Sequence, residues 1–482
     1  MAVAMGTLAF LARVLNLGQF SMWLDEILET LFVRGSFAAS LRALASDGVH
    51  PPLEGILAWV LVHGGATETL RRLVNVGFGV GTVLLLCRWV GGRFGARAAW
   101  VAGVLAALSP VHVRYSQELR PYSIGLFFLV MALWRFDVLV ENPTRRNAVW
   151  LWLACLGCLY SLYLSAGILL LLTVVTILRA QSREPTQRLT ARRLTKGLPG
   201  FAAALLAAYS PWLVAVWTLA SPRNIAGPAS WSARFWGERW QFLTIAGREG
   251  EALHIGAVLW LLLCGIGAML AVKMPRARLV VAGALVGTLG VEAGLAAVHH
   301  WSNGRYDLVA WPFLIAVAAL GITAPALAPA PGISWRRLAV AILLTGLAVA
   351  TEVQGLAQYY RAGRPHWDQV AAFVQSRRRD HVTVFVSNEW TRVCLDYYLD
   401  DRPVSLNGSL LRLQEATQDG MPHLVVLGGY PRFKALQTAM RKRKYPLLAR
   451  FGSTGVRVFE TTGSSSRLGR CRVPSEWPEA SR

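Results

Sequence analysis

The sequence predicts a polytopic α-helical membrane protein with a soluble α/β domain towards its carboxyl end. Of its 482 residues, 54% are hydrophobic and only 16% are charged, whereas a soluble chain carries about 25% charged residues. The apolar residues form long runs that are almost free of charge, such as 70–90 and 253–272, and each run is long enough to cross a bilayer. Beyond residue 358 the apolar runs shorten and the charge rises.

We predict about eleven spans, each an apolar run with polar or basic ends. They cover residues 1–19, 70–90, 96–113, 121–139, 148–163, 164–179, 197–219, 253–272, 279–298, 306–327 and 337–357. The run 51–65 is too short to span, so we expect a helix that lies in the membrane interface.

The net charge of +22 has a distribution that fits a membrane protein rather than a nucleic-acid-binding one. Arginine and lysine gather in alternate short loops, which the positive-inside rule places in the cytoplasm. The loops 20–69, 114–120, 220–252 and 299–305, and everything after 358, then face outward. We therefore expect a multi-pass protein of the plasma (inner) membrane, with its polar clusters and its tail outside the cytoplasm.

The carboxyl-terminal part has the pattern of a small α/β domain. Strand-like runs at 381–387 and 423–429 alternate with helical stretches at 366–379, 388–399 and 431–444, which favours a mainly parallel sheet. The expected organisation is a membrane domain over 1–357, an α/β domain over 358–462 and a flexible tail over 463–482. The α/β domain shows no grouping of acid, base and nucleophile, so we expect no catalysis there.

Two acidic residues, Asp25 and Glu26, follow the first span directly. Carboxylates are rarely kept close to spans without a function, and apolar surroundings make a carboxylate a stronger base. Solvated acids on an interfacial helix are the alternative. Further along, His50 precedes two prolines that stiffen the chain and bias it toward an extended conformation. We interpret His50 as an imidazole presented at the membrane surface, and a rigid turn with no role for the histidine is the alternative.

Two further outward loops combine cationic and aromatic side chains. The stretch 109–123 and the stretch 299–312 supply the candidate binding residues Tyr115, Gln117, Glu118, Arg120, Tyr122, Arg305 and Tyr306. Arginine offers a planar fork that suits phosphate, while anchoring at the membrane interface is the alternative. No Walker A loop, HExxH motif or GxGxxG between strand and helix occurs, so an enzyme of this kind would act on an energy-rich substrate in the membrane.

These motifs resemble a known family. RVLNLGQFSMWLDEILET, HPPLEG and SPVHVRYSQELRPYSIGLFF are similar to segments of polyprenol-phosphate-sugar glycosyltransferases of the GT-C fold, in glycosyltransferase family 39. Protein O-mannosyltransferases and the lipid A aminoarabinose transferase are of the same group. The specific marks are Trp-x-Asp-Glu, His-Pro-Pro-Leu and Tyr-Ser-Gln-Glu-x-Arg-x-Tyr, and the resemblance is strongest over residues 13–165.

The resemblance implies an inverting transfer of a sugar from a polyprenyl phosphate to a glycan, lipid or protein acceptor at the outer face. Asp25 would be the catalytic base, with Glu26 beside it, and the 117–122 stretch would line the site. A divalent cation on Asp25 or Glu118 is an open alternative, since oxygen-rich sites suit hard ions. A lipid or sugar transporter with an accessory domain, or a scaffold subunit, are the competing functions.

Overall fold

The computed structural model describes residues 1–181, 185–220, 231–245, 254–275, 277–297, 303–327, 335–362, 366–378, 383–399, 403–409, 412, 415, 421–428, 434–442, 445–451 and 456–461. The expected flexible tail, 463–482, lies outside these residues. The chain forms two compact units, one of Met1–Leu17 with Phe32–Tyr359 and one of Gly18–Leu31 with Tyr360–Arg482. Each unit is described by itself.

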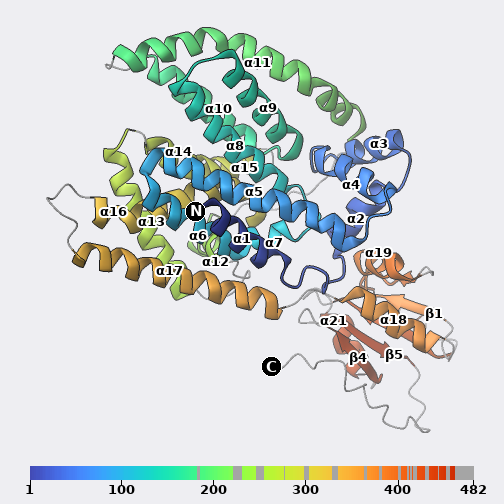
Figure 1. The fold of residues 1–482 in the computed structure, drawn as a ribbon. Coiled ribbons are helices and arrows are strands. Elements are labelled where there is room, and N and C mark those ends of the chain that lie inside the picture. Colours follow the sequence, from blue (N-terminus) through green and yellow to red (C-terminus); the bar gives the residue numbers. More distant parts are fainter. Residues whose placement is uncertain are drawn as a thin grey trace. The chain divides into compact units, whose positions relative to one another are not determined.

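The first unit is almost entirely helical (Figure 1). Its helices are α1 (Ala2–Val14), α3 (Phe37–Asp47), α4 (Leu53–His63), α5 (Glu68–Phe94), α6 (Ala96–Leu108), α7 (Pro110–Ser116), α8 (Tyr122–Glu141), α9 (Arg145–Ser161), α10 (Ser165–Arg179), α11 (Pro185–Leu219), α12 (Ala233–Ile245), α13 (Ile255–Lys273), α14 (Arg278–Leu285), α15 (Val291–Ala297), α16 (Trp311–Leu327) and α17 (Trp335–Ala362). A π turn, η1 (Val286–Gly290), and a 3₁₀ turn, η2 (Gly304–Ala310), interrupt this series.

Many of these helices have the length and composition of membrane spans. Seven helical segments of the described chain are long and apolar enough to cross a bilayer, and the bent pair α6–α7 makes eight if it counts as one span. The helices α1, α4 and α10 are apolar but shorter. The protein is therefore a multi-pass helical membrane protein, as predicted. The run 51–65 does form a helix, α4, and its location in the membrane interface stays a prediction.

The run 96–113, predicted as one continuous span, breaks between α6 and α7 with a bend of 58°. Pro110 lacks the amide that would continue the hydrogen-bond ladder. The freed carbonyls of Ala106 and Ala107 instead accept from the guanidinium of Arg13 on α1, at 3.2 and 3.0 Å. The break turns α7 into a short separate helix that leads to the polar loop 117–121.

Close helix packing holds the middle of this unit together. Helices α13 and α16 approach through Gly267 and Gly321. A Cβ atom at Gly267 would lie 1.9 Å from the carbonyl oxygen of Val317, and one at Gly321 would lie 2.2 Å from that of Leu263. Small residues at a helix crossing allow backbones to approach this closely in membrane proteins.

The second unit contains a five-stranded sheet in the order β2-β1-β3-β5-β4. Its elements are α2 (Leu24–Phe32), α18 (Trp367–Arg377), β1 (Thr383–Val386), α19 (Glu389–Tyr398), β2 (Val404–Ser405), β3 (His423–Leu427), α21 (Lys434–Lys442), β4 (Leu447–Phe451) and β5 (Val456–Glu460). Strands β2, β1 and β3 run parallel, whereas β5 is antiparallel to both β3 and β4. The predicted parallel α/β pattern therefore covers three strands, and the hairpin β4–β5 is additional to it.

Candidate functional site

One side chain connects the loop between α7 and α8 to two other parts of the first unit, the end of α1 and helix α17. Gln117 donates from Nε2 to the carbonyls of Arg13 and Leu15, both at 2.8 Å, and its Oε1 accepts from the hydroxyl of Tyr359 at 2.8 Å. Gln117 is buried. Both the amide nitrogen and the amide oxygen of Gln117 thus bind protein atoms. In the structure this candidate binding residue positions the loop.

Asn75 on α5 fixes the other side of the same loop. Its Nδ2 donates to the carbonyl of Glu118 at 2.6 Å and lies 3.5 Å from that of Arg120, while its own carbonyl accepts from Ser123 Oγ at 2.7 Å. A buried asparagine that satisfies loop carbonyls holds the backbone in one conformation. Asn75 is absent from the sequence-based candidates, because a single amide inside an apolar run gives no motif.

Two loop residues, Arg120 and His50, come together with Tyr115 near the end of α7 and Tyr122 at the start of α8. The guanidinium of Arg120 is in hydrogen-bonding contact with Nε2 of His50. The His50 ring lies 5.9 Å from that of Tyr122, and the Tyr122 ring lies 4.8 Å from that of Tyr115, both edge to face. Since a guanidinium only donates, Nε2 of His50 must accept, which leaves the ring proton on Nδ1. The structure thus unites four candidates that are up to 72 residues apart in the sequence.

Glu118, another candidate, is paired with an arginine of its own loop. Arg114 Nε lies 3.2 Å from Glu118 Oε1 in an i,i+4 arrangement, and the glutamate is almost completely buried. Two further arginines at the start of α5, Arg71 and Arg72, are also buried, and Arg72 donates to the carbonyl of Leu17 at 3.4 Å. The positive charge of this region suits an anion.

Arg305 and Tyr306 lie next to a buried charged group that the sequence analysis did not single out. Arg239 Nε on α12 lies 3.8 Å from Glu292 Oε1 and 3.9 Å from Asp307 Oδ2. The available signal was Glu292, an isolated acid in an apolar run. The group fixes η2, where the Arg305 guanidinium carbon lies 5.8 Å from the centre of the Tyr306 ring.

Phe242 on α12 lies between the two predicted loops. Its ring centre is 6.2 Å from that of Tyr115, and a Cβ atom at Gly304 would lie 2.8 Å from the same ring. The loops around residues 117 and 305 are therefore neighbours in the first unit.

His112 and Trp311 complete the support beneath α7. The two rings stack with their centres 4.2 Å apart, and His112 Nδ1 lies 2.7 Å from a guanidinium nitrogen of Arg13. Trp311 Nε1 donates to Ser109 Oγ at 3.0 Å, at the residue where α6 ends. Arg13, buried in α1, is thus the centre of the contacts that hold the break between α6 and α7.

Asp25 and Glu26 belong to the second unit. They are the second and third residues of α2, and Glu26 Oε2 accepts from the amide of Trp23 at 3.3 Å. A glutamate at the third position that reaches back to the preceding amide is half of a capping box. Glu26 is fully buried and Asp25 is half-buried. The Glu26 carboxylate thus has a structural role at the start of α2.

The segment that carries Asp25 is held by the carboxyl-terminal elements of the same unit. The amide of Met22 donates to the hydroxyl of Tyr398 at 2.7 Å, and the amide of Trp367 donates to Ser21 Oγ at 2.8 Å. Burial raises the pKa of the Cys394 thiol on α19 above its usual range, and the negative charge of Asp25 adds to this effect. Residues 18–31 thus pack on α18 and α19, far along the chain.

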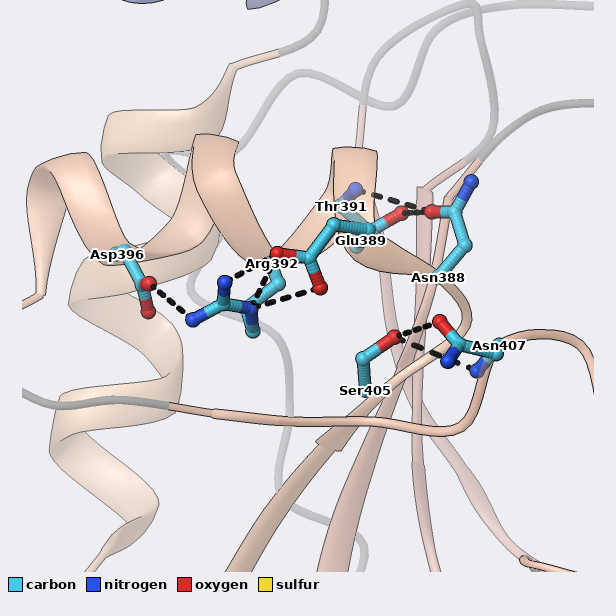
Figure 2. Close-up of polar contacts among 7 residues, drawn as sticks. All are labelled: Asn388, Glu389, Thr391, Arg392, Asp396, Ser405 and Asn407. Atoms are coloured by element: carbon cyan, nitrogen blue, oxygen red, sulfur yellow. Dashed lines mark hydrogen bonds and ion pairs between the residues drawn. The ribbon is translucent and has the colours of Figure 1, made fainter. Parts of the chain in front are cut away.

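The carboxyl ends of the parallel strands carry polar residues that are already used within the domain (Figure 2). Asn388 Oδ1 accepts from the amide of Thr391 at 3.0 Å, and Ser405 Oγ lies 2.8 Å from Asn407 Oδ1. Arg392 pairs with Asp396 at 3.3 Å and with Glu389, and this contact holds the pKa of the Glu389 carboxyl below its usual range. These contacts cap α19 and shape a turn.

No group of three or more His, Cys, Asp or Glu side chains is placed to hold a metal ion within the described residues. Of the two expected ligands, Glu118 is paired with Arg114 in the first unit and Asp25 lies in the second.

The fold is similar to the GT-C fold of known membrane proteins. No protein-family model matches the chain, and no curated protein matches it in sequence. Solved structures of glycosyltransferases of the GT-C fold do match it, which confirms the fold that the motifs implied.

Three such structures illustrate the similarity. ArnT from Cupriavidus metallidurans bound to undecaprenyl phosphate has 14% identity and a TM-score of 0.54, over 97% of this chain and 99% of that one. The Archaeoglobus fulgidus oligosaccharyltransferase tethered with an acceptor peptide has 12% identity and a TM-score of 0.55, over 97% and 74%. The mycobacterial arabinofuranosyltransferase AftD has 13% identity and a TM-score of 0.50, over 96% and 41%.

Proposed function

We propose that this protein is an inverting glycosyltransferase of the plasma membrane that uses a polyprenyl-phosphate sugar as donor. The acceptor is a glycan, a lipid or a protein at the outer face, and the distribution of basic loops supports this side of the membrane. The observation that carries the proposal is the buried contact between Arg120 and His50, within a fold shared with a protein that binds undecaprenyl phosphate.

Arg120, His50 and Arg305 would bind the donor phosphate. A guanidinium supplies two parallel donors to a phosphate, and the buried Arg71 and Arg72 add to the positive potential of the same unit. Because these cations sit among apolar helices, they stabilise the charge that develops on the departing phosphate more strongly than they would in water. Tyr115, Tyr122 and Tyr306 supply apolar walls with a hydroxyl at one end.

Asp25 is the proposed base. It would take the proton of the acceptor hydroxyl while that oxygen attacks the anomeric carbon of the sugar. The bond between the anomeric carbon and the phosphate oxygen breaks on the opposite side, and its electron pair stays on the polyprenyl phosphate. The sugar is thereby bonded to the acceptor with inverted configuration. Glu26 is the weaker choice, since its carboxylate caps α2.

The test is a transfer assay with purified protein, a labelled polyprenyl-phosphate sugar and envelope acceptors. Asp25→Asn should lower turnover by about 10²–10⁴, the range of general-base catalysis, while donor binding is kept. Asp368→Asn is the matched control, because it removes an exposed acid from the first turn of another helix in the same unit. Wild-type transfer by Asp25→Asn would exclude Asp25 as the base.

The arginines should give a different kinetic result. Arg120→Ala and Arg305→Ala should raise the donor concentration needed for half-maximal rate, with a smaller effect on turnover at saturation. Absence of transfer by the wild-type protein, together with donor lipid moving between leaflets of a vesicle, would favour the transporter instead.

A further inference from the structure

A second basic and aromatic site lies at the opposite end of α8 from the loop 117–121. A cleft of about 660 Å³ lies between the carboxyl end of α8 and the amino end of α9. Its lining consists of Met131, Trp134, Arg135, Asn142, Thr144, Arg146, Asn147 and Trp150. The α8 residues in this lining are 9 to 13 residues from Tyr122 at the start of the helix. At about 1.5 Å per residue, the cleft begins roughly 14–20 Å along the helix from the first site.

Arginines and tryptophans are stacked along this cleft. The guanidinium carbon of Arg135 lies 5.0 Å from the ring centre of Trp134 and 5.7 Å from that of Trp150. Arg88 of α5 lies 4.9 Å from the ring centre of Trp134. With Arg146 in the lining, three positive charges meet at one helix end. Stacking on aromatic rings orients a guanidinium while its hydrogen-bond donors remain available at the edge.

None of the three arginines forms an ion pair with a carboxylate of the described residues, although the exposed Glu141 lies next to the cleft at the end of α8. Arg135 donates to Asn147 Oδ1 at 3.2 Å, but its buried Nε has no hydrogen-bond partner in the described part of the chain. Asp137, the acid nearest to Arg135 along α8, forms an ion pair with Arg93, whose Nε lies 2.6 Å from Asp137 Oδ2. A buried donor that lacks a partner costs about 1–3 kcal/mol, and more for a charged group.

The amino end of α9 adds a further preference for an anion. Thr144 caps this helix by accepting from the amide of Asn147 at 3.3 Å. The amides of the first turn point out of a helix of 17 residues, whose dipole places a partial positive charge at this end. The cleft thus offers one helix terminus and two lining guanidinium groups, those of Arg135 and Arg146, to the same bound group, while Arg88 adds positive charge next to Trp134.

We propose that this cleft binds the phosphate headgroup of an anionic membrane phospholipid. The tryptophans are the residues typical of the membrane interface. Just beyond the cleft, α9 exposes Val149, Trp150 and Leu153 by 56%, 41% and 40%, a surface on which acyl chains can lie. A soluble anion would fill the charged part of the cleft and leave this apolar surface uncovered, so the adjoining surface favours a lipid.

Native mass spectrometry of the full-length protein in detergent tests this assignment. Phosphatidylglycerol and phosphatidylcholine with the same acyl chains are added in parallel, and the retained lipid is counted. We expect the wild-type protein to retain phosphatidylglycerol more strongly. Arg135→Gln and Arg146→Gln should each weaken this retention about tenfold, the loss of one charge-assisted hydrogen bond. Since Arg146 is exposed, its variant should fold even if Arg135→Gln does not.

Arg145→Gln is the matched control. It removes an equal charge from the neighbouring exposed residue, which does not line the cleft, so it should leave retention unchanged. An equal loss in Arg145→Gln and Arg146→Gln would mean diffuse attraction and overturn the proposed site. Equal retention of the two lipids would overturn the preference for an anionic headgroup. Displacement of the lipid by an equal concentration of inorganic phosphate would overturn the choice of a lipid.

Discussion

The hydroxyl of Tyr398 should control the order of the segment that carries Asp25. Tyr398→Phe removes the acceptor for the amide of Met22, 2.7 Å away, and leaves the rest of the ring in place. Met22 is fully buried, so its amide gains no compensating water. Leaving a buried amide without a partner costs about 1–3 kcal/mol. The equilibrium between the packed and the open segment should shift by about 5–150-fold.

Hydrogen–deuterium exchange of the peptide that contains Met22 measures this shift, because exchange of a buried amide follows local opening. Tyr445→Phe removes the same oxygen from a partly buried tyrosine of the same unit and should leave exchange near residue 22 unchanged. Sugar transfer should fall in Tyr398→Phe, but by less than in Asp25→Asn. The variant keeps the Asp25 carboxylate, and the segment that carries it is still packed for part of the time. Unchanged protection of Met22 would refute the assigned contact.

Three other changes test the rest of the structure. Arg13→Met removes the donor to three backbone carbonyls, and thermal unfolding in detergent should show a loss of about 3 kcal/mol or more. Gly267→Ala puts a methyl group 1.9 Å from the Val317 carbonyl oxygen, and the same assay should show a cost of about 1–3 kcal/mol. Arg392 lowers the pKa of the Glu389 carboxyl. The contact therefore stabilises the folded protein at pH values above the usual glutamate pKa, and this stabilisation is lost as the pH falls through the lowered pKa. Because the pair is exposed, Glu389→Gln should change stability by no more than about 0.5 kcal/mol, and an NMR titration should show the lowered pKa.

The sequence predicted those elements of the fold that depend on a local property of the chain, such as the length of an apolar run. Apolar runs predicted the long helices, because a span needs only length and the absence of charge. The break between α6 and α7 was missed although Pro110 marks it in the sequence. Its accommodation by Arg13, about a hundred residues earlier, could not be predicted from local sequence. Strand β5 was not predicted, because the arginine and the glutamate of VRVFE leave no continuous apolar run that would indicate a buried strand.

The candidate site shows the same division. The resemblance and the residue types led to Arg120, His50 and Tyr122, which the structure brings together. Asn75 and Arg239 were missed, because their functions in the structure are contacts to loops distant in sequence. A motif marks residues that meet a substrate, while the residues that hold a motif in place have no fixed spacing from it.

The buried arginine of α1 has a consequence for the synthesis of the protein. Arg13 interacts with Ser116, 103 residues later, so its carbonyl and side-chain partners on α6 and α7 do not exist when α1 leaves the ribosome. Arg13 lies in the last turn of α1, where a long cationic side chain can extend to the membrane interface. At 5–20 residues per second, the ribosome needs roughly 5–20 s to reach Ser116. During that time α1 lacks the carbonyls that later bind Arg13, so we expect the guanidinium to remain at the interface and to become buried only when α6 and α7 pack on α1.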